Sequence, residues 1–512
     1  MQIELINVTA RTISIRVCDG GKYFLEGKRK AEIFLNGEYR ETSNKKVVTL
    51  QGLASDTDYE VCVKDGYEKS NMLNIRTKKV SHIINIKEFG AVGDGKKDNT
   101  LLIQAAINIA PKNSLIEITD GDYMTGPLFL KDDITLELKK GASLIGKEDR
   151  ESYPVIPSEI YRTDGKKTYL GSWEGEPQEC FASLLSVINV KNVDIIGEGT
   201  INGNSDYDTW WKRAKEKRTA WRPRTIFILN SENITVEGVE VRNSPSWTVH
   251  PIFSRNIRLL NLYIENPKDS PNTDGIDPES CENVEILGVE FSVGDDCIAI
   301  KSGKGKTARE IGKPSRNIRI EDCYMKFGHG AVVIGSEMSG GIKDIYIRNC
   351  IFEETDRGVR LKTRRGRGGI VDGIYVKDIF MEKVKTPFVI NEFYFCDIDG
   401  KEEYVWSKEP KEVTEETPEI RNVILENIEC IDSEVSAGFV YGLPESRIEN
   451  LKLKDFKVTF SENSEEDFPA MMSFIEKKKK SGFYFNNVRN LEIENVYAED
   501  VTDQEIMKFN VE

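Results

Sequence analysis

Two acidic clusters are the residues in this 512-residue chain whose types and spacing are best suited to chemistry. They are NTDGID at 272–277 and GDDC at 294–297, and Asp274 and Asp295 are 21 residues apart. Cleavage of a glycosidic bond needs a carboxylic acid that protonates the leaving oxygen and a carboxylate that activates water. Adjacent acids can also hold one another protonated near neutral pH. The spacing therefore predicts an acid–base site built from two stacked repeats.

Three basic side chains follow in the next repeats. His329 lies between two glycines, and Arg360 and Lys362 lie in RLK at 360–362. Residues two apart in a strand point to one face, so we expect the two cations on one side. Clustered Asp side chains also suit calcium, and a calcium site is the alternative interpretation of the acidic spacing. Two cations beside three Asp residues would repel a metal but suit a carboxylated sugar, so we expect no metal and no other cofactor.

The elements that position these residues belong to a repetitive segment. Each unit opens with a turn that usually carries Asn and continues with two short strands separated by a bend, as in SENITVEGVEVRNS at 231–244. The Asn residues recur at offsets of 23, 27 and 34, at Asn233, Asn256, Asn283 and Asn317. Such periods are typical of a solenoid. In this unit Ile234, Val236, Val239 and Val241 are expected to line the interior.

We therefore predict an all-β fold in which residues 83–512 form a parallel β-helix. The residues at 99–110 read as a helix that caps its N-terminal end and protects an open sheet edge. No helical stretch is expected between the repeats. A β-propeller is the alternative, but its blades of about 40–45 residues with four strands fit these units poorly.

Residues 1–80 are predicted to form a separate small β-sandwich. Short segments alternate apolar and polar residues at period two, at 13–17, 30–37, 47–53, 58–66 and 73–79. The stretch from Leu53 to Tyr59 resembles the L-x-P-x-T-x-Y corner of fibronectin type III modules, with Ser55 in place of proline. Such a module could bind or position glycan, or could act as a spacer or docking unit.

Together, NTD at 272–274, GDDC at 294–297, GHG at 328–330 and RLK at 360–362 resemble the four signatures of glycoside hydrolase family 28, the polygalacturonases. The resemblance covers about 83–505. It implies a right-handed β-helix and metal-free hydrolysis with inversion. Residues 243–251, 272–281 and 334–341 are similar to the bacterial exo-acting branch of the family, some members of which carry a fibronectin-like module.

The resemblance also implies roles for individual residues. Asp295 would be the general acid, while Asp274 and Asp296 would hold and deprotonate the water. His329 would support the protonation of the acid or contact the sugar. The residues expected to bind the galacturonate substrate are Arg360, Lys362, Asn272 and His250. For inverting hydrolysis the acid and the base are expected about 6.5–9.5 Å apart.

Long loops interrupt the repeats at about 147–182, 204–225 and 391–418, and they hold five of the six Trp residues. Loops on one face of a solenoid commonly build binding sites, and aromatic planes suit sugar rings. The Trp residues could equally anchor the loops to the body. We expect the loops to close one end of the groove.

The expected activity is exo-hydrolysis of polygalacturonan or oligogalacturonides. Other family 28 reactions, on rhamnogalacturonan or xylogalacturonan, are alternatives within the resemblance. A pectate-type lyase on the same fold and a non-catalytic glycan-binding β-helix are alternatives from other classes. Lyases typically need calcium and a basic Lys or Arg that abstracts the proton beside the carboxylate, whereas the NTD and GDD residues favour acid–base hydrolysis.

Composition and charge limit the partners and the compartment. The formal net charge is −15, which makes nucleic acid or an anionic membrane a poor partner. No apolar run approaches the roughly 20 residues of a membrane span. Nine scattered Cys residues and a start without a basic, then apolar, leader favour the cytoplasm, unless a leader was removed.

Overall fold

The N-terminal module contains two antiparallel sheets around one hydrophobic core. In this computed structural model, residues 1–20, 30–66, 68–161, 165 and 167–512 are described. The sheets have the orders β1-β2-β5 and β4-β3-β6-β7. Their strands are β1 (Gln2–Val8), β2 (Ile13–Cys18), β3 (Ala31–Leu35), β4 (Glu38–Ser43), β5 (Val47–Leu50), β6 (Asp58–Lys64) and β7 (Leu73–Arg76). Residues of both sheets, among them Ile15 and Ile33, share that core. The backbone N–H of Ala54 donates to Oη of Tyr59 at 2.9 Å, the hydrogen bond expected of a tyrosine corner.

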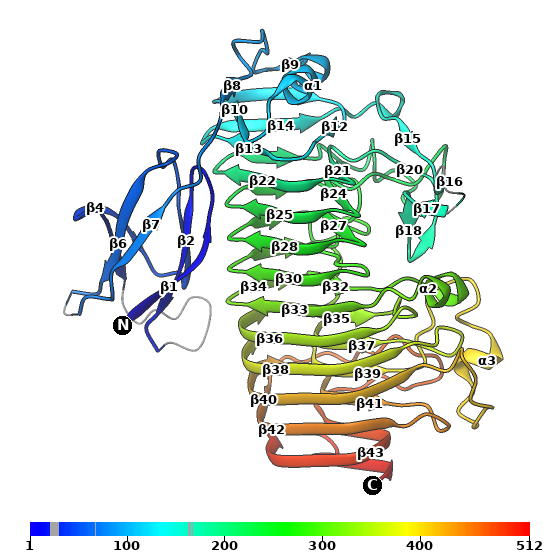
Figure 1. Cartoon of the computed structure of the whole chain (residues 1–512). Helices are drawn as coiled ribbons and strands as arrows, with labels where there is room; N and C mark the ends of the chain where they lie inside the picture. Colours follow the sequence, from blue (N-terminus) through cyan, green and yellow to red (C-terminus); the bar gives the residue numbers. More distant parts are fainter. Residues whose placement is uncertain (21–29, 67, 162–164, 166) are drawn as a thin grey trace.

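The remainder is a right-handed parallel β-helix, which confirms the predicted fold class (Figure 1). Two faces, A and B, pair coil to coil in parallel. Face A contains β8 (Ile83–Asn85), β10 (Ser114–Ile118), β13 (Ile134–Leu138), β22 (Lys191–Gly197), β25 (Glu232–Glu237), β28 (Arg255–Leu260), β30 (Glu282–Leu287) and β33 (Ser315–Glu321). Face B contains β9 (Asp94–Asp98), β11 (Gly121–Thr125), β14 (Ala142–Gly146), β23 (Thr200–Asn202), β26 (Glu240–Arg242), β29 (Tyr263–Glu265), β31 (Glu290–Val293) and β34 (Tyr324–Phe327). Beyond β34, single long strands run through both faces: β36 (Ile342–Glu353), β38 (Ile370–Glu382), β40 (Glu419–Ser433), β42 (Ile448–Phe460) and β43 (Ser481–Ala498).

A third face, face C, carries the predicted chemistry. Its strands are β12 (Leu128–Phe129), β21 (Leu185–Ile188), β24 (Ile226–Leu229), β27 (Val249–Ile252), β32 (Ile298–Ile300), β35 (Val332–Gly335), β37 (Arg357–Lys362), β39 (Thr386–Asn391), β41 (Ser436–Tyr441) and β44 (Ile506–Val511). Ile276 bridges β27 to β32 through Val249 and Ile298, so the face continues through the first acidic cluster. The motifs therefore occupy successive coils of one face.

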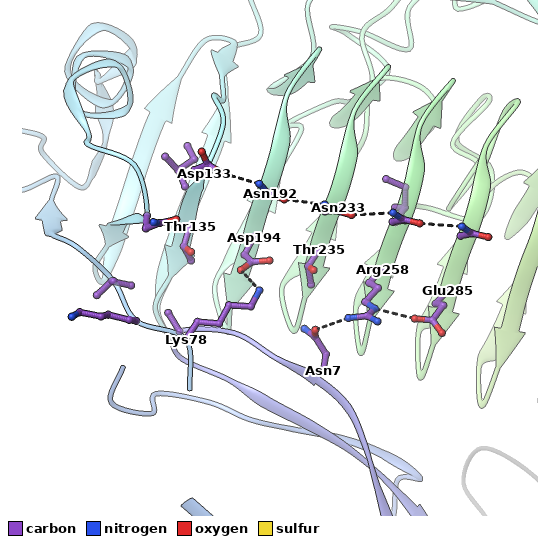
Figure 2. A pocket seen from close by; sticks show the side chains of 18 of the residues that line it. Asn7, Lys78, Asp133, Thr135, Asn192, Asp194, Asn233, Thr235, Arg258 and Glu285 are labelled. Carbon is purple, nitrogen blue, oxygen red and sulfur yellow. Dashed lines mark hydrogen bonds and ion pairs between the residues drawn. The ribbon is translucent and has the colours of Figure 1, made fainter. Parts of the chain in front are cut away.

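The interior of the β-helix is one continuous apolar core. The four residues expected to line it in the unit at 231–244 are all completely buried, which confirms that prediction. The Asn residues that open the units have positive φ, near +55° at Asn256 and Asn283, a conformation that Asn tolerates well. Their side chains form a ladder in which each Nδ2 donates to the side-chain oxygen of the coil before it at 2.7–3.0 Å (Figure 2). The ladder runs from Asn317 through Asn283, Asn256, Asn233 and Asn192 to Asp133.

The N-terminal module docks against face A (Figure 1). Arg16 forms ion pairs with Glu321 at 2.6 Å and with Asp322 at 2.8 Å. The completely buried Glu237 accepts hydrogen bonds from Asn7 at 2.6 Å and from Ser14 at 3.0 Å. A groove of about 760 Å³ between the module and the β-helix holds none of the predicted site residues, and Figure 2 shows the Lys78–Asp194 pair at its edge.

Helices and short strands complete the chain outside the coils. Helix α1 (Thr100–Ile109) buries Ile103 and Ile107 in the core at the N-terminal end, as predicted. Helix α2 (Gly305–Ile311) lies between β32 and β33, so the expectation of no helix between repeats was wrong. The remaining elements are η1 (Arg150–Ser152), β15 (Val155–Ile156), β16 (Glu159–Tyr161), β17 (Lys167–Tyr169), β18 (Ser172–Trp173), β19 (Glu176–Pro177), β20 (Cys180–Phe181) and α3 (Glu403–Trp406). Among the described residues, no helix has the length and hydropathy that crossing a bilayer requires.

Candidate active site

A cleft of about 1,040 Å³ on face C brings the sequence motifs together. Seven of the residues predicted for the site line this cleft: Asn272, Asp274, Asp295, Asp296, His329, Arg360 and Lys362. They come from segments almost 90 residues apart in sequence, and the in-register pairing of β32, β35 and β37 brings these together. His250 is the one predicted site residue that does not line the cleft.

The three carboxylates of the cluster are very close. Asp274, Asp295 and Asp296 each bring one oxygen to within 4.8 Å of the others. The expected acid–base separation of about 6.5–9.5 Å was therefore wrong. Burial raises the pKa of Asp274 well above its ordinary value, and the neighbouring carboxylates of Asp277 and Asp295 raise it further. Its Oδ1 makes no hydrogen bond with the described residues.

Asp295 is paired with His329. Nδ1 of His329 lies 3.3 Å from Oδ1 of Asp295, and the Asp295 side chain is 21% exposed, more than those of the other two carboxylates. Burial raises the pKa of Asp295, but the hydrogen bond and charge of His329 outweigh it and hold that pKa below its ordinary value. The same hydrogen bond raises the pKa of His329. Gly328 permits this approach, because a Cβ there would lie 2.2 Å from the Asp295 carbonyl oxygen.

The two predicted cations contact the third carboxylate. Nζ of Lys362 donates to Oδ2 of Asp296 at 2.8 Å, and Nη1 of Arg360 lies 3.8 Å from its Oδ1. Both side chains are largely buried, with one edge in the cleft. Asp296 therefore lies between two cationic side chains.

His250 lies beneath the site and cannot contact substrate, so its predicted binding role was wrong. Its side chain is completely buried, and its Nε2 is 3.0 Å from Glu279. Its ring packs edge-on against Trp247 with a centroid distance of 4.9 Å. Burial holds the pKa of His250 well below its ordinary value, so the ring is neutral and supports Trp247.

Asn272 lies at the mouth of the acidic cluster and is held by Arg222. Nη2 of Arg222 donates to Oδ1 of Asn272 at 2.7 Å. Nη1 of Arg222 donates to the carbonyl oxygens of Pro245 and Pro271 at 2.6 and 2.9 Å. The arginine therefore joins the loop at 204–225 to the first acidic motif.

The comparisons with known proteins agree with this arrangement. Residues 160–472 match the family described as Glycosyl hydrolases family 28. The chain belongs to this family. The match includes all four motifs of the cleft, and it supports a glycoside hydrolase.

Individual family 28 relatives cover much of the chain. A probable polygalacturonase of Vitis vinifera is 35% identical over 330 residues, which are 62% of this chain and 65% of that protein, so the match spans just under two thirds of its length. An exo-poly-alpha-D-galacturonosidase of Dickeya chrysanthemi is 28% identical over 435 residues, 74% of this chain and 69% of that protein. The solved family 28 exopolygalacturonase of Yersinia enterocolitica shares the fold with a TM-score of 0.73 at 20% identity, over 100% of this chain and 97% of that chain. Endo-polygalacturonases are also among the relatives.

In this family 28 chain the long loops form the walls of the cleft. Trp173 in β18 stacks on Trp221 at 4.5 Å and on Trp247 at 5.3 Å, and all three line the cleft. Trp210 is instead completely buried, and Nε1 of Trp211 donates to a backbone carbonyl at 3.0 Å. Trp210 and Trp211 therefore anchor their loop to the body, whereas the contact of cleft Trp residues with sugar stays a prediction.

A single lysine ties two of these loops to the body. The backbone N–H of Lys304 donates to the carbonyl oxygen of Gly175 at 3.0 Å, at the tip of the β18–β19 hairpin. Its Nζ lies 3.3 Å from Asp397 in the loop at 391–418. Arg364 and Arg367 also pair with Asp397. They therefore brace this loop and are not free cations of the cleft.

Sequence reasoning assigned no role to two charged residues at the site, Asp277 and Lys301. Nζ of Lys301 is 2.7 Å from Oδ2 of Asp277. Asp277 belongs to the quoted acidic motif, whereas Lys301 only ends an apolar strand. The signal that could have identified Lys301 is its place directly after the apolar residues 298–300. A lysine at the end of a buried strand is itself expected to be buried, and burial of a lysine requires a carboxylate partner.

Proposed function

We propose that this chain is an exo-acting polygalacturonase that hydrolyses α-1,4-galacturonosidic bonds of polygalacturonan or oligogalacturonides. The observation that carries the proposal is one cleft in which three carboxylates lie beside a histidine and two cations. Carboxylates supply the acid and the base of glycoside hydrolysis. The cations suit a sugar that itself carries a carboxylate.

The general acid is Asp295, with His329 as its proton store. Before substrate binds, the pair holds its proton mainly on His329, because the lowered pKa of Asp295 favours the carboxylate. The 3.3 Å contact lets the proton pass from Nδ1 to Oδ1 of Asp295 and then to the glycosidic oxygen, as the C–O bond breaks. The greater exposure of Asp295 among the three carboxylates favours it for this contact.

Asp274 and Asp296 hold and deprotonate the attacking water. Two carboxylate oxygens within 4.8 Å can both accept from one water at ordinary hydrogen-bond lengths of about 2.7 Å. The raised pKa of Asp274 makes its ionised carboxylate a stronger base than that of an ordinary Asp. The water's oxygen bonds to the anomeric carbon, and its proton goes to the base. We propose inversion from the family resemblance, although the short carboxylate separation does not itself favour it.

Arg360 and Lys362 read the substrate's carboxylate. A chain with a net charge of −15 offers no long-range attraction to a polyanion, so recognition is local. Both cations already pair with Asp296, and the uronate shares them with it. A charge-assisted contact of this kind contributes about 1.5–3 kcal/mol.

Attack from the chain end follows from the loops. The β18–β19 hairpin and the loop at 391–418 both line the cleft, and Lys304 joins them. Walls that meet in this way turn an open groove into a pocket. The similarity to the exo-acting Dickeya protein supports the same mode, whereas the Pectobacterium relatives act internally.

Chromatography of the products from oligogalacturonides of defined length tests this function. We expect galacturonate or digalacturonate to appear first, from every chain length, with little loss of polymer viscosity per bond cut. A rapid fall in viscosity at low conversion would show internal cutting. Products with unsaturated, ultraviolet-absorbing ends would show a lyase. Cleavage of rhamnogalacturonan or xylogalacturonan alone would show that one of these is the substrate.

We also propose that the enzyme works in a reducing compartment, where it finishes imported oligogalacturonides. All nine Cys residues are free thiols, and seven are buried, so the fold does not depend on a disulfide. Cell fractionation of the native host tests this location. Recovery of the activity outside the cytoplasm would contradict it.

A further inference from the structure

Lys301 is a buried cation that the acid–base scheme above does not use. It follows β32 on face C, and 5% of the residue is exposed. Its Nζ lies 2.7 Å from Oδ2 of Asp277 and 3.8 Å from Oδ2 of Asp274. One ammonium group therefore interacts with two carboxylates, and one of these, Asp274, is the proposed base.

Trp247 covers this ammonium group. Nζ of Lys301 lies 3.8 Å from the centroid of the Trp247 ring, and Trp247 in turn stacks on Trp173. Cation–π contacts of this length hold a side chain in place where water is excluded. Lys301 is therefore fixed by an ion pair and by an aromatic ring, and its own movement is small.

Asp277 competes with Asp274 for the charge of Lys301. Asp277 is completely buried, and burial raises its pKa to about 6 although Lys301 lowers it. Burial lowers the pKa of Lys301, but Asp277, Glu337 and Asp274 together outweigh burial and raise it well above its ordinary value. Lys301 is thus a permanent cation, whereas the charge of Asp277 depends on pH.

We propose that Lys301 is a positioning residue that holds Asp274 in place and favours its ionised form, and that Asp277 sets how much of this charge Asp274 receives. The inference rests on the proposed function, in which Asp274 is the base. Within the cluster, Lys301 approaches Asp274, whereas Arg360 and Lys362 approach Asp296. The two carboxylates therefore pair with different cations, one at Asp274 and two at Asp296.

Other charged groups also face Asp274 from the elements packed around it. Asp277 lies in its own segment, and Asp295 and Asp296 lie in the turn before β32. Arg222 faces it from the loop at 204–225. None of these side chains is altered in the variants of Lys301 below, so a shift in titration reports on Lys301.

The test compares the pH dependence of kcat/KM in Lys301→Met, Lys301→Arg and Asp277→Asn, with trigalacturonate as substrate. Loss of a cation within about 4 Å raises a carboxylate pKa by about one unit or more. The acid limb in Lys301→Met should move to higher pH by that amount, and kcat should fall at least tenfold with little change in KM. Lys301→Arg should keep the wild-type limb. Asp277→Asn should move the limb the opposite way, to lower pH, because Lys301 then serves Asp274 alone.

Lys304→Met is the matched control. Lys304 also lines the cleft, but its Nζ pairs with Asp397, and it should leave the acid limb where it is. An unchanged limb in folded Lys301→Met, or an equal shift in Lys304→Met, would overturn the inference. If Lys301→Met does not fold, the test rests on Asp277→Asn. An acid limb that does not move to lower pH in that variant overturns the inference.

A second readout needs no substrate and separates this inference from the proposed function. Without Lys301, ionised Asp274 and Asp277 are buried without the cation that pairs with both of them, whereas their protonated forms are not affected in this way. The difference in Tm between wild type and Lys301→Met should therefore grow as pH rises from about 4 to 7. Wild type without activity on oligogalacturonides refutes the proposed function, whereas a Tm difference that does not change with pH refutes the inference about Lys301.

Discussion

Lys362 donates a hydrogen bond from Nζ to Oδ2 of Asp296 at 2.8 Å. Asp296 lies just before β32, and Lys362 ends β37, two strands further along face C. Arg360 approaches the same carboxylate at 3.8 Å. The cations expected to bind the substrate thus neutralise one member of the acidic cluster in the unliganded protein. Any uronate that enters the cleft must share them.

Substitution of Lys362 by Met should weaken both recognition and chemistry. Loss of about 1.5–3 kcal/mol corresponds to a ten- to hundredfold lower kcat/KM for oligogalacturonides. The methyl ester lacks the charge that Lys362 reads, so the variant should discriminate less between the free acid and the ester. Lys401→Met, at an exposed cation of the same cleft, is the control and should keep the preference. An unchanged preference in Lys362→Met would show that another residue reads the carboxylate.

Asp295→Asn should lower kcat by about 10²–10⁴-fold, because the amide cannot deliver a proton to the leaving oxygen. KM should change little, since the side chain keeps its shape and its place in the cleft. Steady-state kinetics on trigalacturonate give both values. A non-catalytic glycan-binding protein would lose nothing in this variant, and a kcat close to wild type would remove Asp295 from the role of acid.

The anomeric form of the fresh product should be β from an α-linked substrate. In the proposed mechanism Asp274 and Asp296 hold the water together, and a single displacement by that water inverts the anomeric centre. Nuclear magnetic resonance in the first minutes of reaction distinguishes the two anomers before they equilibrate. The carboxylate separation makes this measurement informative, because a fresh α-anomer would establish retention through a covalent intermediate.

His329→Gln should move the basic limb of the kcat/KM profile to lower pH. In wild type the Asp295–His329 pair keeps its proton until pH passes the raised pKa of His329, above 6.5. In the variant, Asp295 alone must hold the proton, and it loses it at a carboxylate pKa. Activity near neutral pH should therefore fall more than activity near pH 5. A uniform loss at all pH values would assign His329 to sugar contact only.

Removal of residues 1–80 should leave a folded β-helix that still cleaves short oligomers, with a lower Tm. None of the described residues of this segment lines the cleft. The deletion removes Arg16 from Glu321 and Asp322, and it exposes Glu237. These carboxylates regain water, so the loss should be smaller than for Arg16→Met, which leaves Asp322 buried without its 2.8 Å ion pair. Circular dichroism melting tests this, and a folded but inactive truncation would show that the module helps to form the site.

The sequence correctly predicted that the motifs share one cleft. Asp274 and Asp295 are one repeat apart, and Arg360 lies three strands of face C beyond Ile276. In a parallel β-helix each coil pairs in register with the next, so residues at equal phases of successive repeats must lie above one another. Loop insertions change the number of residues in a coil but not this phase.

Several side-chain roles could not be predicted. His250 lies in a motif beside the site, but its side chain points into the core against Glu279. Arg364 and Arg367 follow Lys362 closely, yet they pair with Asp397 from another loop. In the first case the direction of one side chain on a strand decided the outcome. In the second, the partner came from a loop some 30 residues away, and no local pattern marks it.

The sequence by itself determined the coil repeat, the interior residues and the meeting of the four motifs at one cleft, because a periodic backbone fixes which positions coincide. The tertiary structure alone decided the approach of the carboxylates to within 4.8 Å, the allocation of Lys301 to Asp274 and Asp277, and the contacts of two loops with Lys304. These depend on side-chain rotamers and on contacts between loops. Such contacts form where long insertions meet over the coils, and their geometry follows from packing, which the repeat does not encode.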